Sequence, residues 1–391
     1  MTACVNGVDA GAFVDALLAR DVTYFAGVPD TLLRQFCSAL RTRLPAHRHL
    51  IACNEGAAVG TAVGHYLATG TLGMVYMQNS GLGNAMNPLL SLAARQVCGV
   101  PMLLLVGWRG EPEGAADEPQ HQRQGAVTLA LLQACGLRHA LLEHEASRCW
   151  AQLDEAVQQA KYLGEPVALL VRRGLFSSSF GDGCVRAAGL AGGLAREQAL
   201  EACIDALPSD AVTVTTTGMA ARELFEIRAR RGMDHALDFL AVGGMGHAAA
   251  IAFAIAQARP RRCVVCLDGD GAMLMHMGAL SHCAQAANLL HVVINNGAHD
   301  SVGGQPTAAA ALELGRFASA AGYAHVASVG EAAELRGVLG ELLQRRGSSF
   351  IEVRCVKGSR ADLGRPRIPP RINKERFMSA IGAAGVHQEA P

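Results

Sequence analysis

The residues best placed to do chemistry are an aspartate and an asparagine that follow two successive apolar runs. The first run ends in Gly269-Asp270-Gly271, and the next run ends in Asn295-Asn296. If both runs are neighbouring parallel strands, their carboxyl ends lie at one edge of a sheet, and Asp270 and Asn296 can converge on one point. A carboxylate, an amide oxygen and a backbone carbonyl are hard oxygen ligands, which suit octahedral Mg²⁺ together with phosphate oxygens.

The residues around this aspartate also suit a phosphate group. Gly269 and Gly271 let the backbone approach phosphate oxygens closely. A helix predicted to begin near Ala272 directs its positive end to the same place. The two motifs together therefore predict a magnesium–phosphate site at the edge of a sheet.

Two similar motifs have simpler explanations. Gly181-Asp182-Gly183 follows no strand, and the residue that would correspond to Asn296 is Pro208, so we interpret this motif as a linker turn. Cys263 and Cys266 form a C-x-x-C motif inside a predicted strand. Residues three apart on a strand point to opposite faces. The two thiols therefore cannot share a metal ion, and we expect both to be core side chains.

A second carboxylate follows an apolar run in the first half of the chain. Glu55 stands in Cys53-Asn54-Glu55-Gly56, where a strand ends and a helix is predicted to begin. A carboxylate at that position commonly stabilises the first turn of a helix, which is the structural explanation. Beside the magnesium motif, Glu55 also becomes a candidate for catalysis, and the residues alone leave both roles open.

Apolar runs alternate with helical patterns along the whole chain. The runs are nearly continuous in Val, Leu, Ile and Met, which is typical of strands buried on both faces. The pattern predicts the α/β class, with two tandem doubly wound parallel-sheet domains. The predicted strands are 22–26, 50–53, 74–78, 102–107, 139–142, 167–171, 211–216, 263–267, 291–295, 324–329 and 350–355. The predicted helices are 12–19, 31–40, 57–67, 88–97, 127–134, 146–162, 196–206, 220–230, 247–257, 272–287, 315–321 and 331–346.

The boundaries between the domains follow from composition. Residues 177–195 are rich in Ser, Gly and Ala and are predicted to form a linker between domains at 1–176 and 196–357. The tail, 358–391, begins with a basic, proline-rich stretch that we expect to lie over a surface. No repeat is visible between the sequences of the two halves.

Composition excludes several classes of function. Lys plus Arg and Asp plus Glu both number 34, so no global field favours nucleic acid or an anionic membrane. No apolar stretch approaches the ~20 residues that a membrane helix needs, and the first residues lack the pattern of a signal peptide. The twelve cysteines are scattered, which is typical of reduced thiols in a cytoplasmic protein.

Taken together, the motifs resemble those of thiamine-diphosphate-dependent enzymes of the pyruvate-decarboxylase type. The sequence is especially similar to the phosphonopyruvate and sulfopyruvate decarboxylase families, over nearly the whole chain. This resemblance implies that 1–176 binds the aminopyrimidine, that 196–357 binds the diphosphate and Mg²⁺, and that there is no middle domain. The segments that carry it are 25–30, 54–58, 78–84, 108–112, 117–121, 244–247, 296–307 and 362–366.

The resemblance also implies roles for individual residues. Glu55 matches the glutamate that hydrogen-bonds the aminopyrimidine ring nitrogen, and Met245 matches the apolar residue that holds the cofactor bent. The implied metal ligands are Asp270, Asn296 and the Ala298 carbonyl. The other implied cofactor contacts are Gly81, Thr217, Gly218, Gly244, Gly269, Gly271, Ala272 and Asn296.

The implied activity is decarboxylation of a small anionic 2-oxo acid. We favour 3-phosphonopyruvate, giving phosphonoacetaldehyde and CO₂ in phosphonate biosynthesis. Candidates for catalysis beside Glu55 are Asp30, His121 (expected in a polar loop) and His299, and candidates for substrate contact are Asp30, Asn79, Ser80 and His121. A phosphonate dianion needs Arg, Lys or backbone amides. Arg109, Arg360 and Arg365 are candidates for that contact, and a surface role is equally open for each.

Other functions stay open at this stage. A sulfopyruvate decarboxylase is the first alternative, followed by another 2-oxo acid decarboxylase and by a non-catalytic subunit with the same fold. A carboligase of the acetohydroxyacid synthase type is disfavoured because no flavin-binding middle domain fits. A nicotinamide dinucleotide enzyme is disfavoured because no good G-x-G-x-x-G motif follows a strand. The resemblance further implies a homodimer or higher homo-oligomer, with active sites at the subunit interface.

Overall fold

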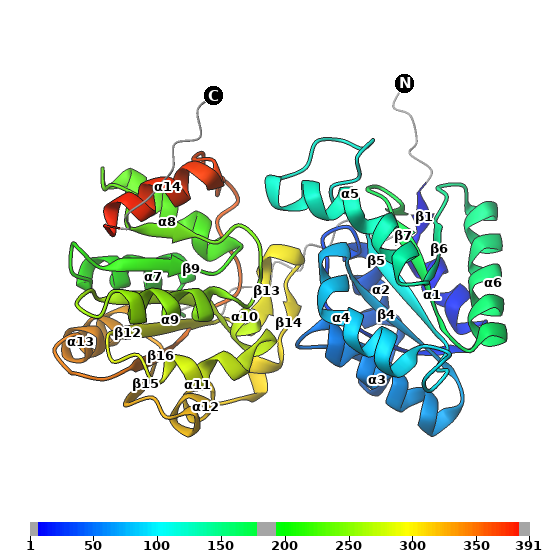
Figure 1. The fold of residues 1–391 in the computed structure, drawn as a ribbon, viewed down its shortest axis with the longest axis horizontal. Helices are drawn as coiled ribbons and strands as arrows, with labels where there is room; N and C mark the ends of the chain where they lie inside the picture. Colours follow the sequence, from blue (N-terminus) through cyan, green and yellow to red (C-terminus); the bar gives the residue numbers. More distant parts are fainter. Residues whose placement is uncertain (1–6, 178–192, 383–391) are drawn as a thin grey trace. The chain divides into compact units, whose positions relative to one another are not determined.

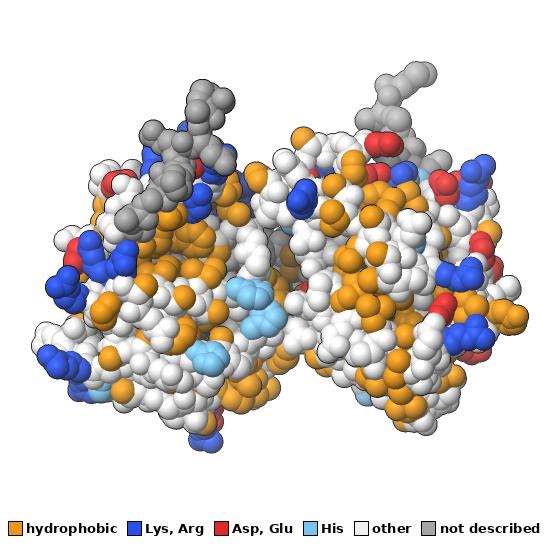
Figure 2. All heavy atoms as spheres, in the orientation of Figure 1, with side chains coloured by type: hydrophobic (Ala, Val, Ile, Leu, Met, Phe, Trp, Pro, Cys, Tyr) orange, Lys and Arg blue, Asp and Glu red, His pale blue; other side chains and the backbone are white. Residues whose placement is uncertain are grey.

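A computed structural model of the chain describes residues 7–177 and 193–382. The protein forms two compact units, Met1–Cys184 and Val185–Pro391 (Figure 1). Most of the predicted linker, including the Gly181-Asp182-Gly183 motif, lies outside the described residues. No helix in the described ranges has the length and apolar character to cross a membrane. On the face drawn in Figure 2, Lys and Arg side chains are scattered over both units rather than gathered in one patch.

The first unit is built on six parallel strands in the order β3-β2-β4-β5-β7-β6. Strand β4 is buried on both faces: Met74 and Tyr76 join the core on one side, and Val75 and Met77 join the core on the other. The alternation follows from the two-residue period of a strand. The strands are β2 Val22–Gly27, β3 His49–Ile51, β4 Leu72–Gln78, β5 Met102–Gly107, β6 Arg138–Leu141 and β7 Pro166–Val171, with a small parallel pair formed by β1 Val8–Asp9 and β8 Phe176–Ser177.

Helices cover both faces of this sheet. Side chains of α1, α2 and α6 fill the core on one face, and side chains of α3, α4 and α5 fill the core on the other. The helices are α1 Ala10–Leu18, α2 Arg34–Arg43, α3 Glu55–Thr69, α4 Leu82–Pro88, α5 Pro119–Ala134 and α6 Ala146–Leu163. The unit is therefore a doubly wound α/β layer structure, as predicted.

Two helices of the first unit differ from the prediction. A helix was expected over 88–97, but α4 begins earlier, at Leu82, and continues as a single π-helical segment over Leu89–Ala93. Helix α5 was expected from 127 but begins at Pro119, since proline suits the first turn of a helix, where its missing N–H is not needed. His121 therefore lies on the first turn of α5, and the expectation that it lies in a loop is wrong.

The second unit repeats this plan. Its six parallel strands follow the order β10-β9-β11-β12-β16-β15, which is the order of the first unit when the strands of each sheet are numbered along the chain. The strands are β9 Val212–Thr215, β10 Asp238–Leu240, β11 Val264–Gly269, β12 Leu289–Asn295, β15 His325–Val329 and β16 Ser349–Arg354, with an antiparallel pair formed by β13 Ala298–His299 and β14 Gln305–Pro306. Two domains that share no visible sequence repeat thus share one topology.

Helices also pack on both faces of the second sheet. Those on one face are α7 Arg196–Ala206, α8 Met219–Arg230 and α13 Ala332–Leu342. Those on the other are α9 Ala248–Ala258, α10 Asp270–Met275, α11 Leu280–Cys283, α12 Leu314–Ala321 and α14 Pro370–Ala380. Cys266 belongs to one of these cores and Cys263 packs against the other, which confirms that the two thiols face apart.

The short strands β10, β13 and β14 were not predicted, and two helical segments of the second unit differ from the prediction. The helix predicted over 272–287 is broken into α10 and α11 by a 3₁₀ turn at Met277–Ala279, which contains the poor helix former Gly278. The segment predicted to be an extended tail includes helix α14. Its Phe377 is buried in the core, and its Asn373 bonds to the backbone of β10 at Asp238 and Leu240.

Candidate active site

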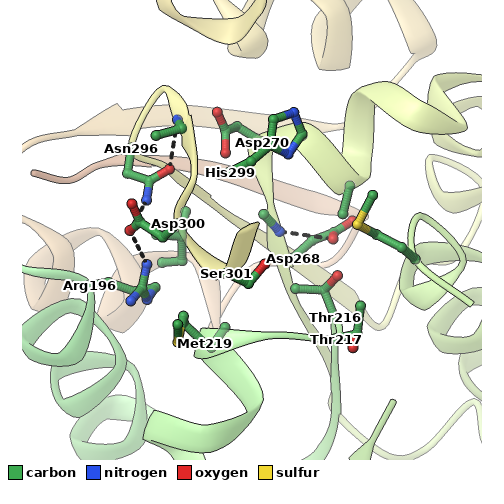
Figure 3. A pocket seen from close by; sticks show the side chains of 17 residues that line it. Arg196, Thr216, Thr217, Met219, Asp268, Asp270, Asn296, His299, Asp300 and Ser301 are labelled. Carbon is green, nitrogen blue, oxygen red and sulfur yellow. Dashed lines mark hydrogen bonds and ion pairs between the residues drawn. The ribbon is translucent and has the colours of Figure 1, made fainter. Parts of the chain in front are cut away.

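A pocket in the second unit lies at the carboxyl ends of β9, β11 and β12 (Figure 3). Asp270 and Asn296 both line it, so neighbouring strand ends bring these two distant residues together. This edge of an open parallel sheet is where such folds commonly bind ligands. Of the residues expected at the cofactor or substrate, those that line the pocket are Thr217, Met245, Gly269, Asp270, Gly271, Ala272, Asn296, Ala298 and His299.

Asp270 is buried at the start of α10, and one of its oxygens is held by a neighbour. The Thr307 hydroxyl donates a hydrogen bond to Oδ2 of Asp270 over 2.5 Å. Burial raises the pKa of Asp270 to about 6, and the Thr307 hydrogen bond acts in the opposite direction. A carboxylate in such a setting is stabilised by a nearby cation. The side chain is therefore suited to binding a metal ion.

Asn296 and Ala298 offer two further oxygens to the same pocket. The Asn296 amide donates through Nδ2 to Oδ2 of Asp300 at 2.7 Å, which leaves its oxygen as the end able to bind a cation. Pro306, opposite Ala298 in the β13–β14 ladder, has no N–H and cannot donate to the Ala298 carbonyl. One carboxylate and two neutral oxygens form a donor set that fits Mg²⁺.

A short loop carries Met245 into the pocket wall. Gly244 and Gly246 have φ values of 64° and 87°, a left-handed conformation that glycine adopts without strain. A Cβ at position 246 would also lie 2.7 Å from the His276 ring. Both glycines are therefore needed to hold Met245 in place.

Thr217 and Gly218 lie in another loop, between β9 and α8. The Thr217 hydroxyl donates to the Val242 carbonyl at 3.0 Å, and Gly218 has a φ of 102°.

His299 borders the pocket beside Gly271. A Cβ at position 271 would lie 2.7 Å from the His299 ring, so the motif glycine leaves room for the imidazole. Burial lowers the pKa of His299 to about 4, and nearby Asp300 raises it slightly. The ring is therefore neutral near pH 7 and can donate from one nitrogen and accept at the other.

Beneath the motif lies a buried polar cluster. Cys266, Asp268 and His291 bring potential ligand atoms within 4.8 Å of one another. His291 bonds through Nδ1 to the Tyr323 hydroxyl at 2.9 Å, and its Nε2 lies 3.4 Å from Asp268. These bonds account for the cluster without an ion. Asp268 also accepts from the Gly269 N–H, so the cluster supports the backbone of the motif.

Glu55 is the predicted catalytic carboxylate of the first unit. It is buried at the start of α3, and Nδ2 of Asn84 donates to its Oε2 at 2.8 Å. Asn54, not Glu55, caps α3, since the Asn54 side chain accepts the Ala57 N–H at 2.8 Å. Gly81 leaves the space that the Glu55 carboxylate occupies. Burial raises the pKa of Glu55, and the Asn84 hydrogen bond opposes that rise.

A second group of polar residues in the first unit surrounds Asp30. The Leu32 N–H donates to its Oδ2, whereas its buried Oδ1 has no hydrogen-bond partner among the described residues. Burial raises the pKa of Asp30 to about 6. Arg109 contacts Thr31 at 3.0 Å and forms a two-point ion pair with Asp117. Its guanidinium is therefore already partly neutralised.

The other predicted substrate residues have different surroundings. The Asn79 amide bonds at both ends to the Arg109 backbone and also to Thr128, so it joins two strand ends. Ser80 is exposed and accepts a hydrogen bond from Gln78. Burial lowers the pKa of His121, and the positive charge of Arg109 lowers it further. Arg360 does not line the pocket and pairs with Glu197, Glu226 and Asp362.

Several residues of these sites were not singled out in the sequence. Asp300 and Thr307 hold two pocket side chains, and both stand in the 296–307 segment that carries the resemblance, which was a usable signal. Arg196 lines the pocket from the start of α7, and Asn84 holds Glu55. Nothing in the pattern around Arg196 marks it, because its partners are distant in the sequence.

Comparison with known proteins gives consistent matches for both units. Residues 10–131 match the N-terminal, and residues 214–353 the C-terminal, thiamine pyrophosphate-binding domain of thiamine pyrophosphate enzymes. Phosphonopyruvate decarboxylases of Streptomyces viridochromogenes and Streptomyces hygroscopicus are each 34% identical, covering 96% and 95% of this chain and 95% and 93% of their own. A sulfopyruvate decarboxylase of Methanosarcina acetivorans is 30% identical and covers 84% of this chain and 86% of its own.

Proposed function

This chain belongs to the thiamine-diphosphate-dependent decarboxylases, in the group that contains the phosphonopyruvate and sulfopyruvate decarboxylases, and on that premise we propose that it converts 3-phosphonopyruvate into phosphonoacetaldehyde and CO₂. The observation that carries the proposal is the pocket in which Asp270, Asn296 and Ala298 meet. The choice of substrate is supported by the two Streptomyces relatives, which match nearly the full length of the chain.

The residues of the pocket fit a diphosphate bridged by Mg²⁺. Asp270, Asn296 and the Ala298 carbonyl would hold the ion, with diphosphate oxygens completing its shell. Gly269, Gly271, Ala272, Thr217 and Gly218 would contact the diphosphate, and Met245 with Gly244 would support the rings. Thiamine diphosphate, when bound, supplies the electron sink that makes loss of CO₂ possible.

Glu55 is proposed to hold a proton at the aminopyrimidine ring nitrogen. Its buried carboxylate has a raised pKa, which suits a group that shares a proton with a ring nitrogen rather than one that is fully solvated. Asn84 fixes one carboxylate oxygen, and Gly81 leaves room for the other. Because Asn54 already caps α3, the capping role considered for Glu55 is not needed.

Asp30, His121 and His299 are proposed to move protons near the substrate. Burial raises the pKa of Asp30 to about 6, and its buried Oδ1 has no hydrogen-bond partner in the described part of the chain, so it can exchange a proton near neutral pH. Arg109 belongs to the polar group around Asp30, and we therefore favour Arg109 over Arg360 as the contact for the phosphonate. Arg360 is already surrounded by three carboxylates.

The test of the substrate is an aldehyde-release assay with phosphonopyruvate, sulfopyruvate and pyruvate. We expect kcat/KM for phosphonopyruvate to exceed that for pyruvate by at least about a hundredfold, since a site built for a charged group strongly rejects an analogue that lacks it. Sulfopyruvate is the second candidate, favoured by the Methanosarcina relative. A higher kcat/KM for sulfopyruvate than for phosphonopyruvate would overturn the proposal.

The test of the cofactor site is thiamine diphosphate binding with and without a divalent ion. Binding should need Mg²⁺, and Asp270→Ala should abolish that dependence because it removes the charged ligand. Equal binding before and after EDTA treatment of the wild-type protein would show that no metal bridge exists.

A homodimer or higher homo-oligomer is proposed as the active form. Figure 2 shows hydrophobic side chains gathered over the α3 and α4 region of the first unit. In the same unit, Leu67 on α3 is 72% exposed and Val97 is 53% exposed. Clustered exposed apolar residues commonly mark an interface.

The proposed location of the protein is the cytoplasm. This is supported by the ten described cysteines, none of which forms a disulfide.

A further inference from the structure

Asn296 could offer either end of its amide to the pocket, but only the oxygen can bind a cation. Its Nδ2 donates to Oδ2 of Asp300 at 2.7 Å, and its Oδ1 accepts from the Ala298 N–H at 3.1 Å (Figure 3). A carboxylate only accepts hydrogen bonds. An amide turned through 180° would therefore place two oxygens against each other at Asp300. The contacts with Asp300 and with the Ala298 N–H together determine which end of Asn296 is available.

Asp300 is itself fixed by two further donors. Oδ2 of Asp300 accepts from Nη1 of Arg196 at 2.8 Å and from the Gly358 N–H at 3.0 Å, in addition to Asn296. Three donors on one oxygen leave little freedom for the carboxylate to turn. Rotation away from the pocket would also leave part of a buried guanidinium unpaired, which is costly.

Arg196 links Asp300 to a second buried carboxylate. Its side chain is only 6% exposed and makes a two-point ion pair with Glu223 at 2.7 and 2.9 Å. Its remaining contact is to the Gly358 carbonyl at 3.2 Å. The chain Glu223–Arg196–Asp300–Asn296 therefore carries two negative charges and one positive charge. It ends beside the proposed cation site with an excess of negative charge, which favours a divalent ion.

The other metal ligand is held in an equivalent way. Thr307 donates to Oδ2 of Asp270, just as Asn296 is held through its Nδ2. In both side chains a neighbouring side chain engages one polar atom, and the other atom is an oxygen that keeps a lone pair for the ion, although in Asn296 this oxygen also accepts from the Ala298 N–H. Such outer partners commonly set the affinity of a metal site.

We propose that Asp300 is a positioning residue that selects the oxygen-forward orientation of Asn296 and thereby sets the affinity of the site for its divalent cation. The inference rests on the proposed function, because the cation is the one that would bridge the cofactor diphosphate. It adds a residue, Asp300, that influences the affinity for the cation without being one of its ligands.

The test measures Mn²⁺ binding by electron paramagnetic resonance, with saturating thiamine diphosphate and no substrate. Mn²⁺ favours the same oxygen ligands as Mg²⁺. Asp300→Asn should weaken binding about 10- to 100-fold, the range found for outer partners of metal ligands. The reason is that an amide at position 300 can accept or donate, so Asn296 loses one of the two contacts that fix its orientation.

The matched control is Asp238→Asn. Asp238 has a 1% exposed side chain and pairs with Arg228 at 2.6 Å in the same unit, but it does not line the pocket. The same substitution therefore disturbs a comparable buried ion pair away from the site. Mn²⁺ affinity within about threefold of wild type is expected for this variant, since it leaves the ligands and their partners intact.

A double variant separates orientation from general damage. Adding Asn296→Asp to Asp300→Asn supplies a ligand whose two oxygens are equivalent, and the added negative charge faces an amide rather than Asp300. Part of the lost affinity should return. Equal losses in Asp300→Asn and Asp238→Asn, no loss in Asp300→Asn, or no recovery in the double variant would each overturn the inference. A wild-type protein that binds no Mn²⁺ would instead overturn the proposed cofactor site.

Discussion

At the scale of single residues, the position of Glu55 depends on the absence of a side chain at Gly81. A Cβ at position 81 would lie 2.4 Å from Oε1 of Glu55, whereas a Cβ at Gly83 would meet nothing within 4 Å. We expect Gly81→Ala to displace the carboxylate and to lower the decarboxylation rate at least about tenfold. Gly83→Ala is the matched control and should keep the wild-type rate. Equal rates for the two variants in an aldehyde-release assay would argue against a positioned Glu55.

The carboxylate itself can be tested with Glu55→Gln. The amide keeps an oxygen that can accept from Asn84, so the packing should survive. Loss of the proton-holding group should lower kcat by at least about a hundredfold, as for other general acid–base residues. Circular dichroism should show an unchanged helix content because Asn54 caps α3. Wild-type kcat would mean that Glu55 has only a packing role.

Asp30 should make the first unit less stable as the pH rises. In the unfolded chain its carboxyl ionises near its ordinary pKa of 3.8, whereas burial raises the folded value to about 6. Well below pH 3.8 both states are protonated and there is no penalty. Between these two values the unfolded state loses its proton first, and stability falls. Since one pKa unit corresponds to about 1.4 kcal/mol, the full penalty above pH 6 is about 3 kcal/mol.

Asp30→Asn should remove this penalty. Because the unfolded carboxyl is already partly ionised at pH 4, the variant's gain in stability over wild type should be about 2 kcal/mol larger at pH 8 than at pH 4. Urea unfolding followed by tryptophan fluorescence measures this, because Trp108 and Trp150 are the only two tryptophans and both lie in the first unit. The exposed Asp21→Asn is the control and should show a difference within about 0.5 kcal/mol. A pH-independent gain in the Asp30 variant would contradict the burial argument.

The residues proposed to act on the cofactor could be identified from the sequence, whereas the contacts made by the residues that hold them could not. Asp270, Asn296 and Glu55 each follow a strand, so their position in the fold follows from the local pattern. Asp300 and Thr307 act through contacts made by a loop that folds back as β13 and β14. Such contacts depend on tertiary packing, which no periodicity encodes.

At the scale of elements, helix α14 closes one face of the second unit. Phe377 is 4% exposed, and its ring lies 5.6 Å from that of Phe239. Arg259 on the neighbouring loop donates to the Ile381 carbonyl at 2.9 Å. The proline-rich composition before this helix indicates an extended segment, and that local signal hides a helix whose stability comes from the core it covers.

The contribution of α14 can be measured with Phe377→Ala. Truncation of a buried phenylalanine leaves a cavity and should cost about 3 kcal/mol in the free energy of unfolding. Ile372→Ala, on the same helix but 38% exposed, is the control and should cost less than about 1 kcal/mol. Far-ultraviolet circular dichroism in urea is the suitable probe. Equal small losses for both variants would mean that α14 is not part of the folded core.

Most strands of the two sheets were predictable, because a long apolar run in an α/β pattern indicates a strand buried on both faces. Strand β5 and helix α7 have the predicted bounds, 102–107 and 196–206. The failures share a physical cause. Strand β10 has only three residues, and α10 has six and ends at a 3₁₀ turn, so both are too short for their pattern to repeat recognisably.

At the scale of the whole molecule, the proposed cofactor residues are divided between two units. Glu55 belongs to the first unit, and Asp270 belongs to the second. If one active site uses Glu55 of one chain and Asp270 of another, mixing Glu55→Ala with Asp270→Ala chains should restore activity. Random exchange would make about half of the dimers hybrids. Each hybrid has one intact site of two, so about a quarter of the wild-type rate is expected. Verified exchange without recovery would rule out a shared site.

The common strand order of the two units makes their functional positions comparable. Glu55 follows β3, and Met245 follows β10, which holds the same place in its own sheet. By the same comparison, Gly81 after β4 corresponds to Asp270 after β11, and Arg109 after β5 corresponds to Asn296 after β12. This is the pattern that duplication of an ancestral half-sized gene would leave once the copies had diverged in sequence. On that view, one ancestral binding edge gave rise both to the edge that carries Glu55 and to the one that carries the metal ligands.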